Sequence, residues 1–596
     1  MKPLSETYID KSTYNDEKSN LKKKLMKWSE EFSIKSNAFS SLLKILKGER
    51  HPTLPADCRT LLKTVRKSNL IQNHDGSQMT YFGIVKNLLA HDLKKICNGD
   101  KDVKLKINID GLPISKSTGD QFWPILCQVV SKYKISPFLV ACYWGKTKPK
   151  SVDDFLDCFI KEMHSIKSNG FNQDGTSYNV AIHSIVCDAR VSIKCIKGHG
   201  GYYGCERCVQ KGLSVNRRVF LENKAEKRTD DSFKFQTQEE HYIGTSPLLK
   251  LDASLITKVP LDYMHLVVLG AMRKLLLYWI RKGDCSVRIG MTNQISLIFD
   301  KLVSLSKHTP SEFSRKPRSL KEVDRYKATE LRQTLFYTGP VVFRHVLPDH
   351  IYNHFLVLHV AISTLANDVK VQNESEITYA ENLLIFFVQE MEKIYKQESI
   401  VYNIHNLIHF ADDVRRFGCL DKFSCFPFEN FLFQLKSTLR TPNRPFSQLC
   451  RRESEKRIGK IEKDIPEIEL RGPRDNGPSL TLRGRQFQKV TYNGSKISTI
   501  YLNDSFVQLS NQKIVKVANI INTGINDDPE SIFLICNQFS NYEDYYSYPC
   551  SSKRQSIYKI GKPSNKLIYR NIKCVTHICL VSSELKVAIF LIHEIF

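Results

Sequence analysis

The sequence contains no apolar run of the 18 or more residues that a membrane-spanning helix requires. Its densest apolar stretch, LLIFFV at residues 383–388, has the length of a core segment. The start, MKPLSETYIDKSTYNDEKSN, includes no apolar stretch of the kind that a secretion signal contains. We therefore expect neither a membrane protein nor a secreted one.

A pattern of paired cysteines typical of disulfide frameworks is also missing. The 17 cysteines are an odd number and are scattered over a large chain. This usage indicates a reducing compartment, in which most of the thiols serve as small buried apolar groups. No internal repeat is present.

Acidic residues are scarce relative to basic ones. The chain has 62 Asp and Glu against 88 Lys and Arg, and its net charge is +26. Such a surplus favours a polyanionic partner, with nucleic acid first and an anionic membrane surface or plain solubility as alternatives. A DNA partner in a reducing compartment indicates the nucleus. At 596 residues, of which 41% are apolar, the chain should form more than one globular domain.

Residues 1–100 are predicted to be helical. Apolar residues recur at helical spacing over residues 21–48 and again over 79–96. The stretch LPADCRTLLKTVRKS between them places four basic residues beside an apolar stripe. It is interpreted either as a DNA-contacting face or as a solvated helix face.

Residues 101–190 read as strands that surround one helix. VKLKINIDG alternates apolar and polar residues, and QFWPILCQVVS and SPFLVACYWG follow it. SVDDFLDCFIKEMHSIKSNG is predicted to be a helix that ends at Gly170, and SYNVAIHSIVCDA to be a fourth strand. Three strands, a helix and a strand are similar to the opening half of a ribonuclease-H-like fold.

The rest of the chain is predicted to interrupt, complete and extend this core. Residues 191–400 form a large, mainly helical insertion, and residues 401–462 carry the end of the core. Residues 463–475 include RGPRDNGPS and are interpreted as a linker. The short β-patterned runs of residues 476–596 predict a small antiparallel domain resembling a β-barrel.

Three acidic residues stand where elements begin or end. Asp110 and Asp188 each close a predicted strand, and Glu429 opens a predicted helix after Pro427. Singly, such residues are more often a turn former or a first-turn glutamate that the helix dipole stabilises. Two carboxylates at neighbouring strand ends, however, share a charge that a bound cation makes tolerable.

A CxxC pair and an HxxxH pair supply four candidate zinc ligands. They are Cys205 and Cys208 in GYYGCERC, and His405 and His409 in YNIHNLIHF. A thiol redox pair is the alternative for the cysteines, and a polar seam in a helix bundle is the alternative for the histidines. Cys195 and His199, just before the CxxC, compete as ligands of a local zinc knuckle.

Two further groups are candidate DNA contacts. Asp262 and His265 form a DxxH at or near a helix start, which is either a buried hydrogen-bonded pair or a contact to a scissile phosphate. Lys436 and Arg440 follow Glu429 on the same predicted helix and would suit a rim that holds phosphates.

These motifs together resemble the DDE transposases of the CACTA, Mirage and Chapaev group. The resemblance covers about residues 50–450 and rests on four blocks: IDGLPISKS with FWPIL, CDARVSIKCIKGHGGYYGCERC, VPLDYMHLVVLGAM, and HNLIHFADDVRRFGCLDKFSCFPFENFLFQLKSTLRTPNRP. The catalytic subunit of the V(D)J recombinase has a related arrangement, with a CxxC after the second Asp and a His pair before the Glu. Here 17 positions separate Asp188 from Cys205, and 20 separate His409 from Glu429.

The resemblance implies a DNA transposase that cuts and pastes a mobile element. It implies that Asp110, Asp188 and Glu429 hold two Mg²⁺ (or Mn²⁺) ions, that the two cysteines and two histidines hold one Zn²⁺, and that His265 contacts DNA. A homodimer is expected, with neither a membrane nor a small-molecule substrate. Two alternatives are a domesticated DNA- or chromatin-binding protein without catalysis and a nuclease that does not transpose. No named DNA-binding module is recognisable, so recognition of DNA ends is assigned to residues 1–100 and the C-terminal β region.

Overall fold

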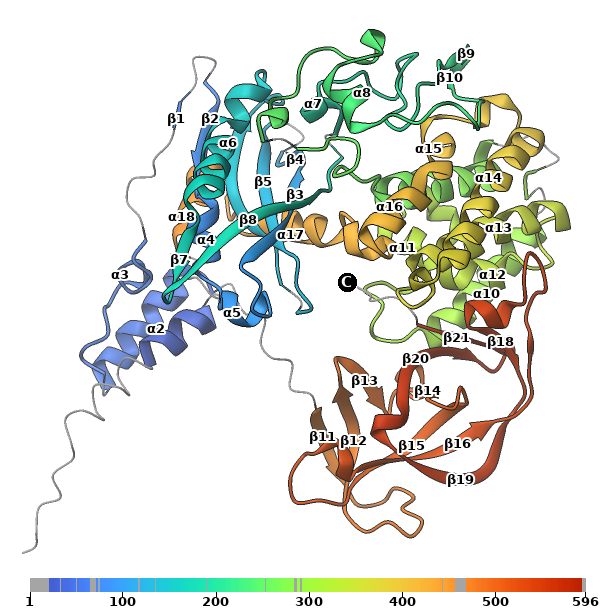
Figure 1. The fold of residues 1–596 in the computed structure, drawn as a ribbon. Coiled ribbons are helices and arrows are strands. Elements are labelled where there is room, and N and C mark those ends of the chain that lie inside the picture. Colours follow the sequence, from blue (N-terminus) through green and yellow to red (C-terminus); the bar gives the residue numbers. More distant parts are fainter. Residues whose placement is uncertain are drawn as a thin grey trace, which may run out of the picture. The chain divides into compact units, whose positions relative to one another are not determined.

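The computed structural model describes residues 21–591 except 30, 33, 50, 65–70, 73–75, 116–117, 134, 189, 252, 283–286, 290–291, 442 and 456–467. The described chain is a mixed α/β structure (Figure 1). It divides into two compact units. The first comprises Met1–Val103, Ile109–Ala181 and Phe428–Ile461, and the second comprises Lys104–Asn108, Ile182–Pro427 and Glu462–Phe596. No helix in the described ranges is both long enough and apolar enough to cross a bilayer.

The N-terminal helices of the first unit pack around a small core of their own. Residues 21–29 are helical, and α2 (Ser36–Glu49) and α3 (Cys58–Leu62) follow. Asp57 caps α3 by accepting a hydrogen bond from the backbone N–H of Arg59. The core cluster consists of Phe39, Leu43, Leu54, Cys58 and Leu61. Two of the four basic residues that suggested a DNA-contacting face, at positions 66 and 67, lie outside the described residues.

One sheet contains the strands of the first part of the chain. Its described strands are β1 (Ile71–Gln72), β2 (Gln78–Tyr81), β3 (Asp102–Ile109), β4 (Leu112–Pro113), β5 (Gln121–Val129), β6 (Phe138–Gly145), β7 (Phe171–Gln173) and β8 (Thr176–Ile185). The order is β1-β2-β6-β5-β3-β8-β7, and β4 pairs with β5 outside this path. The strands predicted within residues 101–190 are thereby confirmed.

The direction of pairing changes between β3 and β8. The pairs β1–β2, β2–β6, β5–β6 and β7–β8 are antiparallel. In contrast, the backbone N–H of Asn179 donates to Lys101 O, and that of Val186 donates to Ile107 O. Both partners advance together along the chain, so β8 runs parallel to β3.

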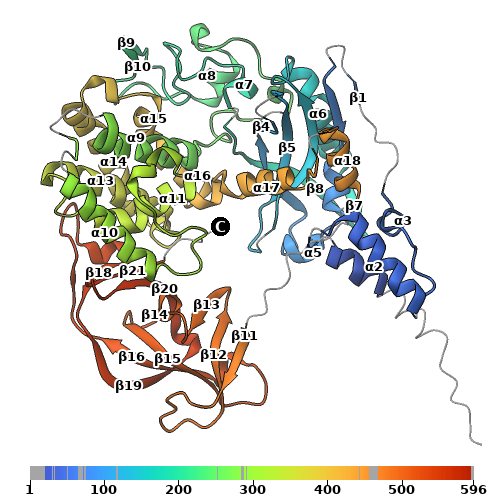
Figure 2. The same cartoon turned by 180° about the vertical axis from the view of Figure 1, so that it is seen from behind.

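Helices cover both faces of the sheet in the first unit (Figures 1 and 2). They are α6 (Val152–Asn169) and α18 (Pro445–Glu455). Tyr143 of β6 meets Phe155 of α6 edge to face, with 6.4 Å between the ring centroids. Its neighbour Trp144 points to the opposite face, because successive strand residues alternate, and stacks on Phe446 of α18 at 6.5 Å. The helix predicted at residues 151–170 is α6.

Residues 79–96 do not form the single helix that was predicted. The strand β2 comes first and pairs with β6, and two short helices, α4 (Ile84–Leu88) and α5 (Leu93–Ile96), follow. Glu162 of α6 accepts hydrogen bonds from the backbone N–H groups of Ile84 (2.7 Å) and Val85 (3.2 Å) and so starts α4. The prediction was wrong because distant segments, β6 and α6, override the local helical spacing.

The second unit begins with loops and short elements. These are α7 (Arg190–Lys194), β9 (Leu213–Val215), β10 (Arg217–Val219), α8 (Asp230–Lys234), η1 (Glu239–His241) and η2 (Pro247–Leu251). The predicted helical insertion therefore begins as a loop-rich segment. Side-chain hydrogen bonds and ion pairs stabilise the conformation of such loops, and they surround the CxxC pair.

Helices dominate the second unit from Met264 onward. They are η3 (Met264–Met272), α9 (Arg273–Leu277), η4 (Tyr278–Lys282), α10 (Thr292–His308), η5 (Leu320–Arg325), α11 (Ala328–Gln333), η6 (Thr334–Thr338), α12 (Gly339–Val342), α13 (Asp349–Ala366), η7 (Lys370–Gln372), α14 (Glu374–Tyr395), η8 (Gln397–Ser399), α15 (Tyr402–His405), η9 (Asn406–His409), α16 (Phe410–Phe417), η10 (Leu420–Phe423) and α17 (Phe426–Ser437), of which the last continues into the first unit. The π-helical segments are η3, η4 and η6. The central helix is α13, which is apolar on nearly every side and is buried along most of its length.

An antiparallel sheet forms the C-terminal part of the second unit. Its strands are β11 (Ile468–Arg474), β12 (Arg485–Tyr492), β13 (Ser495–Ser498), β14 (Phe506–Leu509), β15 (Ile514–Asn522), β16 (Ile532–Phe539), β17 (Tyr542–Asp544), β18 (Ile557–Ile560), β19 (Pro563–Asn571), β20 (Val575–Ser582) and β21 (Val587–Phe590). Short 3-10 turns connect them: η11 (Leu502–Asp504), η12 (Pro529–Ser531), η13 (Ser552–Gln555) and η14 (Ile572–Cys574). The predicted antiparallel sheet is confirmed, and it begins at β11, within the segment interpreted as a linker.

This sheet is joined to the helices of the same unit by buried polar contacts. His359 of α13 lies 3.0 Å, through its Nε2, from the hydroxyl of Tyr546. Gln555 donates to the hydroxyl of Thr364 at 3.2 Å. Both views show β18 and β21 beside the helical region (Figures 1 and 2). Because buried polar groups of this kind need their partners, the sheet and the helices form one folded unit.

Candidate metal centre and acidic site

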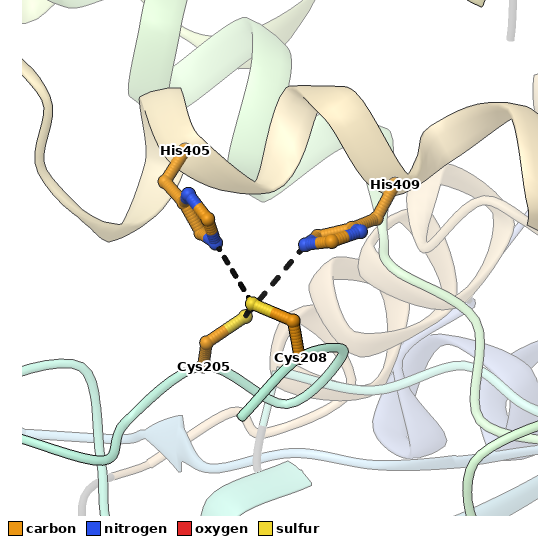
Figure 3. Close-up of side chains that lie close together, drawn as sticks. All are labelled: Cys205, Cys208, His405 and His409. Carbon is orange, nitrogen blue, oxygen red and sulfur yellow. Dashed lines mark hydrogen bonds between the residues drawn. The ribbon is translucent and has the colours of Figure 1, made fainter. Parts of the chain in front are cut away.

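The two histidines of the HxxxH motif close two successive short helices. His405 is the last residue of α15, and His409 is the last residue of η9. Their spacing of four positions places both imidazoles on the same side, and both rings point toward the same sulfur atoms (Figure 3). The chain tightens to a 3-10 turn between the two ligands.

The two cysteines lie on a loop whose path depends on a glycine. Gly204 precedes Cys205, and a Cβ at that position would lie 2.5 Å from the backbone oxygen of Gly198. The backbone N–H of Arg207 donates to the Sγ of Cys205 at 3.4 Å and turns the loop back toward Cys208. A larger residue cannot replace Gly204 without moving the loop. The glycine therefore helps to bring the two sulfur atoms close together.

The four side chains converge on a common centre within the second unit. Their ligand atoms all lie within 4.8 Å of one another. The Sγ of Cys208 is 3.5 Å from the Sγ of Cys205 and 3.3 Å from Nε2 of His405, and the Sγ of Cys205 is 3.8 Å from Nε2 of His409. Tetrahedral zinc at its usual bond lengths separates such ligands by about 3.4–3.8 Å. The geometry can therefore hold a zinc ion.

The pKa shifts of Cys205 and His409 also suit metal ligands. Burial by itself raises the pKa of the Cys205 thiol, but the hydrogen bond from Cys208 and the rings of His405 and His409 hold that pKa well below its usual value. The hydrogen bond to Cys205 raises the pKa of Cys208. Burial lowers the pKa of His409 and so favours the neutral imidazole that binds metals.

The structure favours neither a redox role for the two cysteines nor a local zinc knuckle. Both sulfurs are almost completely buried, whereas redox-active thiols are usually accessible. Among the described residues, the cluster that contains the CxxC pair is completed by the two distant histidines and includes neither Cys195 nor His199. Cys195 instead donates to the backbone oxygen of Ser192. A local zinc knuckle is therefore not the arrangement that the structure adopts.

The two residues between the cysteines were not predicted to matter, and both form buried ion pairs. Glu206 lies 3.4 Å from Arg190 and 3.2 Å from Lys194 of α7, and it accepts a hydrogen bond from the hydroxyl of Tyr402. Burial raises the pKa of Glu206, but Arg190 and Lys194 outweigh it and lower that pKa to about 2. Glu206 thus connects the helix after β8 to the helix that carries His405.

Arg207 makes the second buried ion pair and holds another loop. Its guanidinium lies 2.8 Å from the carboxylate of Asp413 on α16 and donates to the backbone oxygens of Ile256 and Val259. Asp413 also accepts a hydrogen bond from the backbone N–H of Leu261 at 2.8 Å. Burial raises the pKa of Asp413, and Arg207 opposes that shift. The CxxC loop, α16 and residues 256–261 are therefore fastened together.

Replacing Arg207 with methionine is expected to lower the free energy of unfolding of the second unit by about 3 kcal/mol. The change leaves a carboxylate at position 413 that is fully buried and deprived of its closest cation. The matched control is Arg415→Met, which removes a partly exposed cation from Glu374 and Glu381 and should cost about 1 kcal/mol or less. Urea unfolding of both variants measures the difference. Equal losses would contradict the assigned role of Arg207.

Two of the three predicted acidic ligands come together in the first unit. Asp110 follows β3, and Glu429 lies in the first turn of α17. One carboxylate oxygen of each lies within 4.8 Å of the other, and both side chains are half-buried. The carboxylate of Asp110 is held in part by the backbone N–H of Gly111, which donates to its Oδ1 at 2.7 Å. The paired carboxylates could hold a divalent cation.

Asp188 belongs to the second unit. It is exposed in the bend between β8 and α7, two residues before Arg190. Its place at the C-terminal end of a strand agrees with the prediction. Its role as a metal ligand stays a prediction.

Asp262 and His265 form a hydrogen-bonded pair at the start of η3. The fully buried Asp262 accepts from Nδ1 of His265 at 2.7 Å and from its backbone N–H at 3.0 Å. Its other oxygen accepts from the backbone N–H of Cys425 at 2.8 Å. Burial raises the pKa of Asp262, and His265 with these N–H groups lowers it overall. The aspartate thereby fixes the orientation of the His265 ring, which remains partly exposed.

The two predicted phosphate contacts are engaged within the first unit, but only Lys436 lies on α17, because that helix ends at Ser437, before Arg440. Lys436 donates to the backbone oxygen of Pro113 at 2.5 Å, and Arg440 donates to the backbone oxygen of Ile34 at 2.9 Å. Both side chains are exposed. They therefore tether α17 to the loop after Asp110 and to the N-terminal helices, and their contact with DNA stays a prediction.

One comparison with known proteins gives a match, and it concerns the β-rich region. A protein family described as a domain of unknown function (DUF8592) matches residues 473–590. This stretch runs from the end of β11 to the last residue of β21. No curated protein matches the chain. The match thus covers the C-terminal sheet and includes no residue of the metal centre or the acidic site.

Proposed function

We propose that the protein is a DNA transposase that cuts and joins DNA strands at a site formed by Asp110, Asp188 and Glu429. The observation that carries the proposal is the pairing of Asp110 with Glu429. These residues are 319 positions apart in the chain, yet their carboxylate oxygens lie within 4.8 Å of one another. Two half-buried carboxylates at this separation repel each other unless a cation or a proton lies between them.

We infer that divalent metal ions bind at this pair of carboxylates. Carboxylate oxygens are the ligands that Mg²⁺ and Mn²⁺ prefer. Bound between such carboxylates, these ions activate a water molecule or a 3′-hydroxyl for in-line attack on a phosphodiester and stabilise the leaving oxygen. Asp110, held by Gly111, and Glu429, held at the start of α17, would supply fixed ligands for this purpose.

The strand order supports a ribonuclease-H-like core. β6, β5 and β3 lie side by side in the sheet, and β8 joins parallel to β3 after the helix α6. Asp110 directly follows β3, and Asp188 follows β8.

A structural zinc ion is the second part of the proposal. Cys205, Cys208, His405 and His409 have the donor types, separations and burial of a structural zinc site. Bound there, zinc would fasten the segment that follows Asp188 to the segment that precedes Glu429. It would thereby stabilise the large insertion between the two halves of the core.

DNA is the proposed substrate and partner. The net charge of +26 supports a polyanionic partner and predicts binding that weakens steeply with salt. A nuclear location and a homodimer remain part of the proposal through the family resemblance, and neither a membrane nor a small-molecule substrate enters it.

The test is a strand-transfer assay with DNA taken from the flanks of the coding region. With Mg²⁺, the parent protein is expected to cut this DNA and join it to a target plasmid. Asp110→Asn and Asp188→Asn are expected to bind the same DNA and to produce neither cut nor joined strands. Products from either variant at the parental rate would refute the catalytic assignment.

The same assay separates the proposal from its alternatives. A parent protein that binds DNA but never cuts it would be the domesticated, non-catalytic protein. A protein that cuts but never joins strands would be a nuclease.

A further inference from the structure

Lysine side chains line one face of β3 within the second unit. Lys104 and Lys106 alternate with Val103, Leu105 and Ile107, which are buried on the other face. Because strand residues two apart share a face, both ammonium groups project to the same side of the sheet. Lys104 is exposed and Lys106 is half-buried.

Three further cationic or ionisable groups gather at this face. His183 comes from β8, which runs parallel beside β3, and its ring packs against Phe417 with 5.4 Å between centroids. Lys258 is brought to β8 by its backbone oxygen, which accepts from the N–H of Ile185 at 2.8 Å. Lys422 of η10 acts electrostatically on Lys106. Lys104, Lys106 and Lys258 act electrostatically on His183, and Lys422 acts on Lys106.

Burial and like charge both act on these groups. Burial lowers the pKa of His183 to about 4, and Lys106, Lys104 and Lys258 add to the shift. Burial likewise lowers the pKa of Lys106 to about 8, with Lys422 contributing. Lys422 lies 2.5 Å from Asp368, but both of these side chains are largely exposed, so the pair screens the cluster weakly. The fold therefore gathers several positively charged side chains at this face.

We propose that Lys104, Lys106, Lys258 and Lys422, with His183 among them, form an anion-binding site that takes phosphates of a DNA backbone. The inference rests on the proposed function for the identity of the anion. A phosphate placed over the strand face would neutralise the repulsion that the apo fold tolerates. Ammonium groups on flexible stems suit phosphate as point charges and carry no base specificity. This site is separate from Lys436 and Arg440, which are tethered within the first unit.

Binding of a labelled DNA duplex at increasing KCl tests the site. For Lys106→Met, the slope of log affinity against log salt is expected to fall by about 0.9, and for the double variant Lys106→Met/Lys258→Met by about twice that. The control is Lys161→Met on α6, whose ammonium group is exposed and paired with Asp157, and it should leave the slope unchanged. An unchanged slope in the double variant, with parental binding intact, overturns the inference and leaves the proposed function standing.

Thermal unfolding without DNA provides the second readout. Lys106→Met is expected to melt at the parental temperature or above it, because methionine removes a half-buried charge from a repulsive cluster. A lower melting temperature together with an unchanged salt slope would show that Lys106 is only a structural residue. Inorganic phosphate is the probe that tests whether the site binds free phosphate and not the phosphates of DNA. Stabilisation of the parent by phosphate but not by DNA would overturn the assignment to nucleic acid.

Discussion

Cys205→Ser is expected to release one equivalent of zinc per chain and to unfold much of the second unit. A serine hydroxyl binds zinc poorly, and the remaining three ligands would hold the ion weakly. Structural zinc contributes on the order of 10–16 kcal/mol in isolated zinc-finger peptides, which is comparable to the whole stability of an ordinary domain. Elemental analysis of the purified protein measures the zinc, and circular dichroism with urea unfolding measures the structure.

The control is Cys536→Ser in β16, where the thiol is equally buried but lies outside the cluster. That change should retain the zinc and cost about 1–3 kcal/mol, because a hydroxyl replaces a buried thiol. A chelator added to the parent protein should reproduce the effect of Cys205→Ser. Full zinc content in Cys205→Ser would mean that other residues bind the metal.

Glu429→Gln is expected to abolish DNA cleavage while leaving DNA binding intact. The amide keeps the size of the side chain at the start of α17 but removes the negative charge that pairs with Asp110 around a divalent ion. Metal ions stabilise the transition state of phosphoryl transfer by several kcal/mol, and each 1.4 kcal/mol is about tenfold in rate. The cleavage rate should therefore fall by about 10³-fold or more, as measured by single-turnover kinetics at saturating protein.

The matched control is Glu543→Gln in β17, an exposed glutamate that pairs with Lys559. It should cleave at the parental rate. Fluorescence anisotropy of labelled DNA checks that both variants bind equally. Cleavage by Glu429→Gln at the rate of the control would remove Glu429 from the site and, with it, the main support for the proposed chemistry.

Local patterns in the sequence predicted much of the core correctly. The alternation of Val103, Leu105 and Ile107 with lysines identified β3 and placed Asp110 directly after it. The helical spacing after Ser151 predicted α6, which Ser151 caps by accepting from the N–H of Asp154. These predictions succeeded because periodicity and capping are properties of residues close together in the chain.

Other elements were missed because distant residues decide them. The residues of β2 were predicted to be helical because their apolar positions fit helical spacing. In the structure they form a strand because they pair with β6. β11 was read as linker because it contains Gly472 and Pro473, yet it pairs along its length with β12. An edge strand tolerates proline, and its partner was invisible to a local pattern.

The metal centre shows the same division. The spacing of Cys205 and Cys208 and that of His405 and His409 marked all four residues as possible ligands. Cys195 and His199 could also have supplied the two further ligands that the CxxC pair needs. From the sequence, the choice between a local and a distant pair of ligands therefore remained open. The sequence analysis did not single out Glu206 and Arg207. Two opposite charges between the cysteines of a CxxC pair are a signal that indicates buried ion pairs.

The sequence by itself determined the four donor residues, the strand-end acids and the excess of positive charge, since these depend on residue type and local spacing. Only the tertiary structure decided that the histidine pair completes the cysteine cluster, that Glu429 meets Asp110, and that Lys104, Lys106 and Lys258 act on His183. The physical reason is that each of these encounters joins segments far apart in the chain. Packing of the whole fold, rather than any local preference, sets their separation.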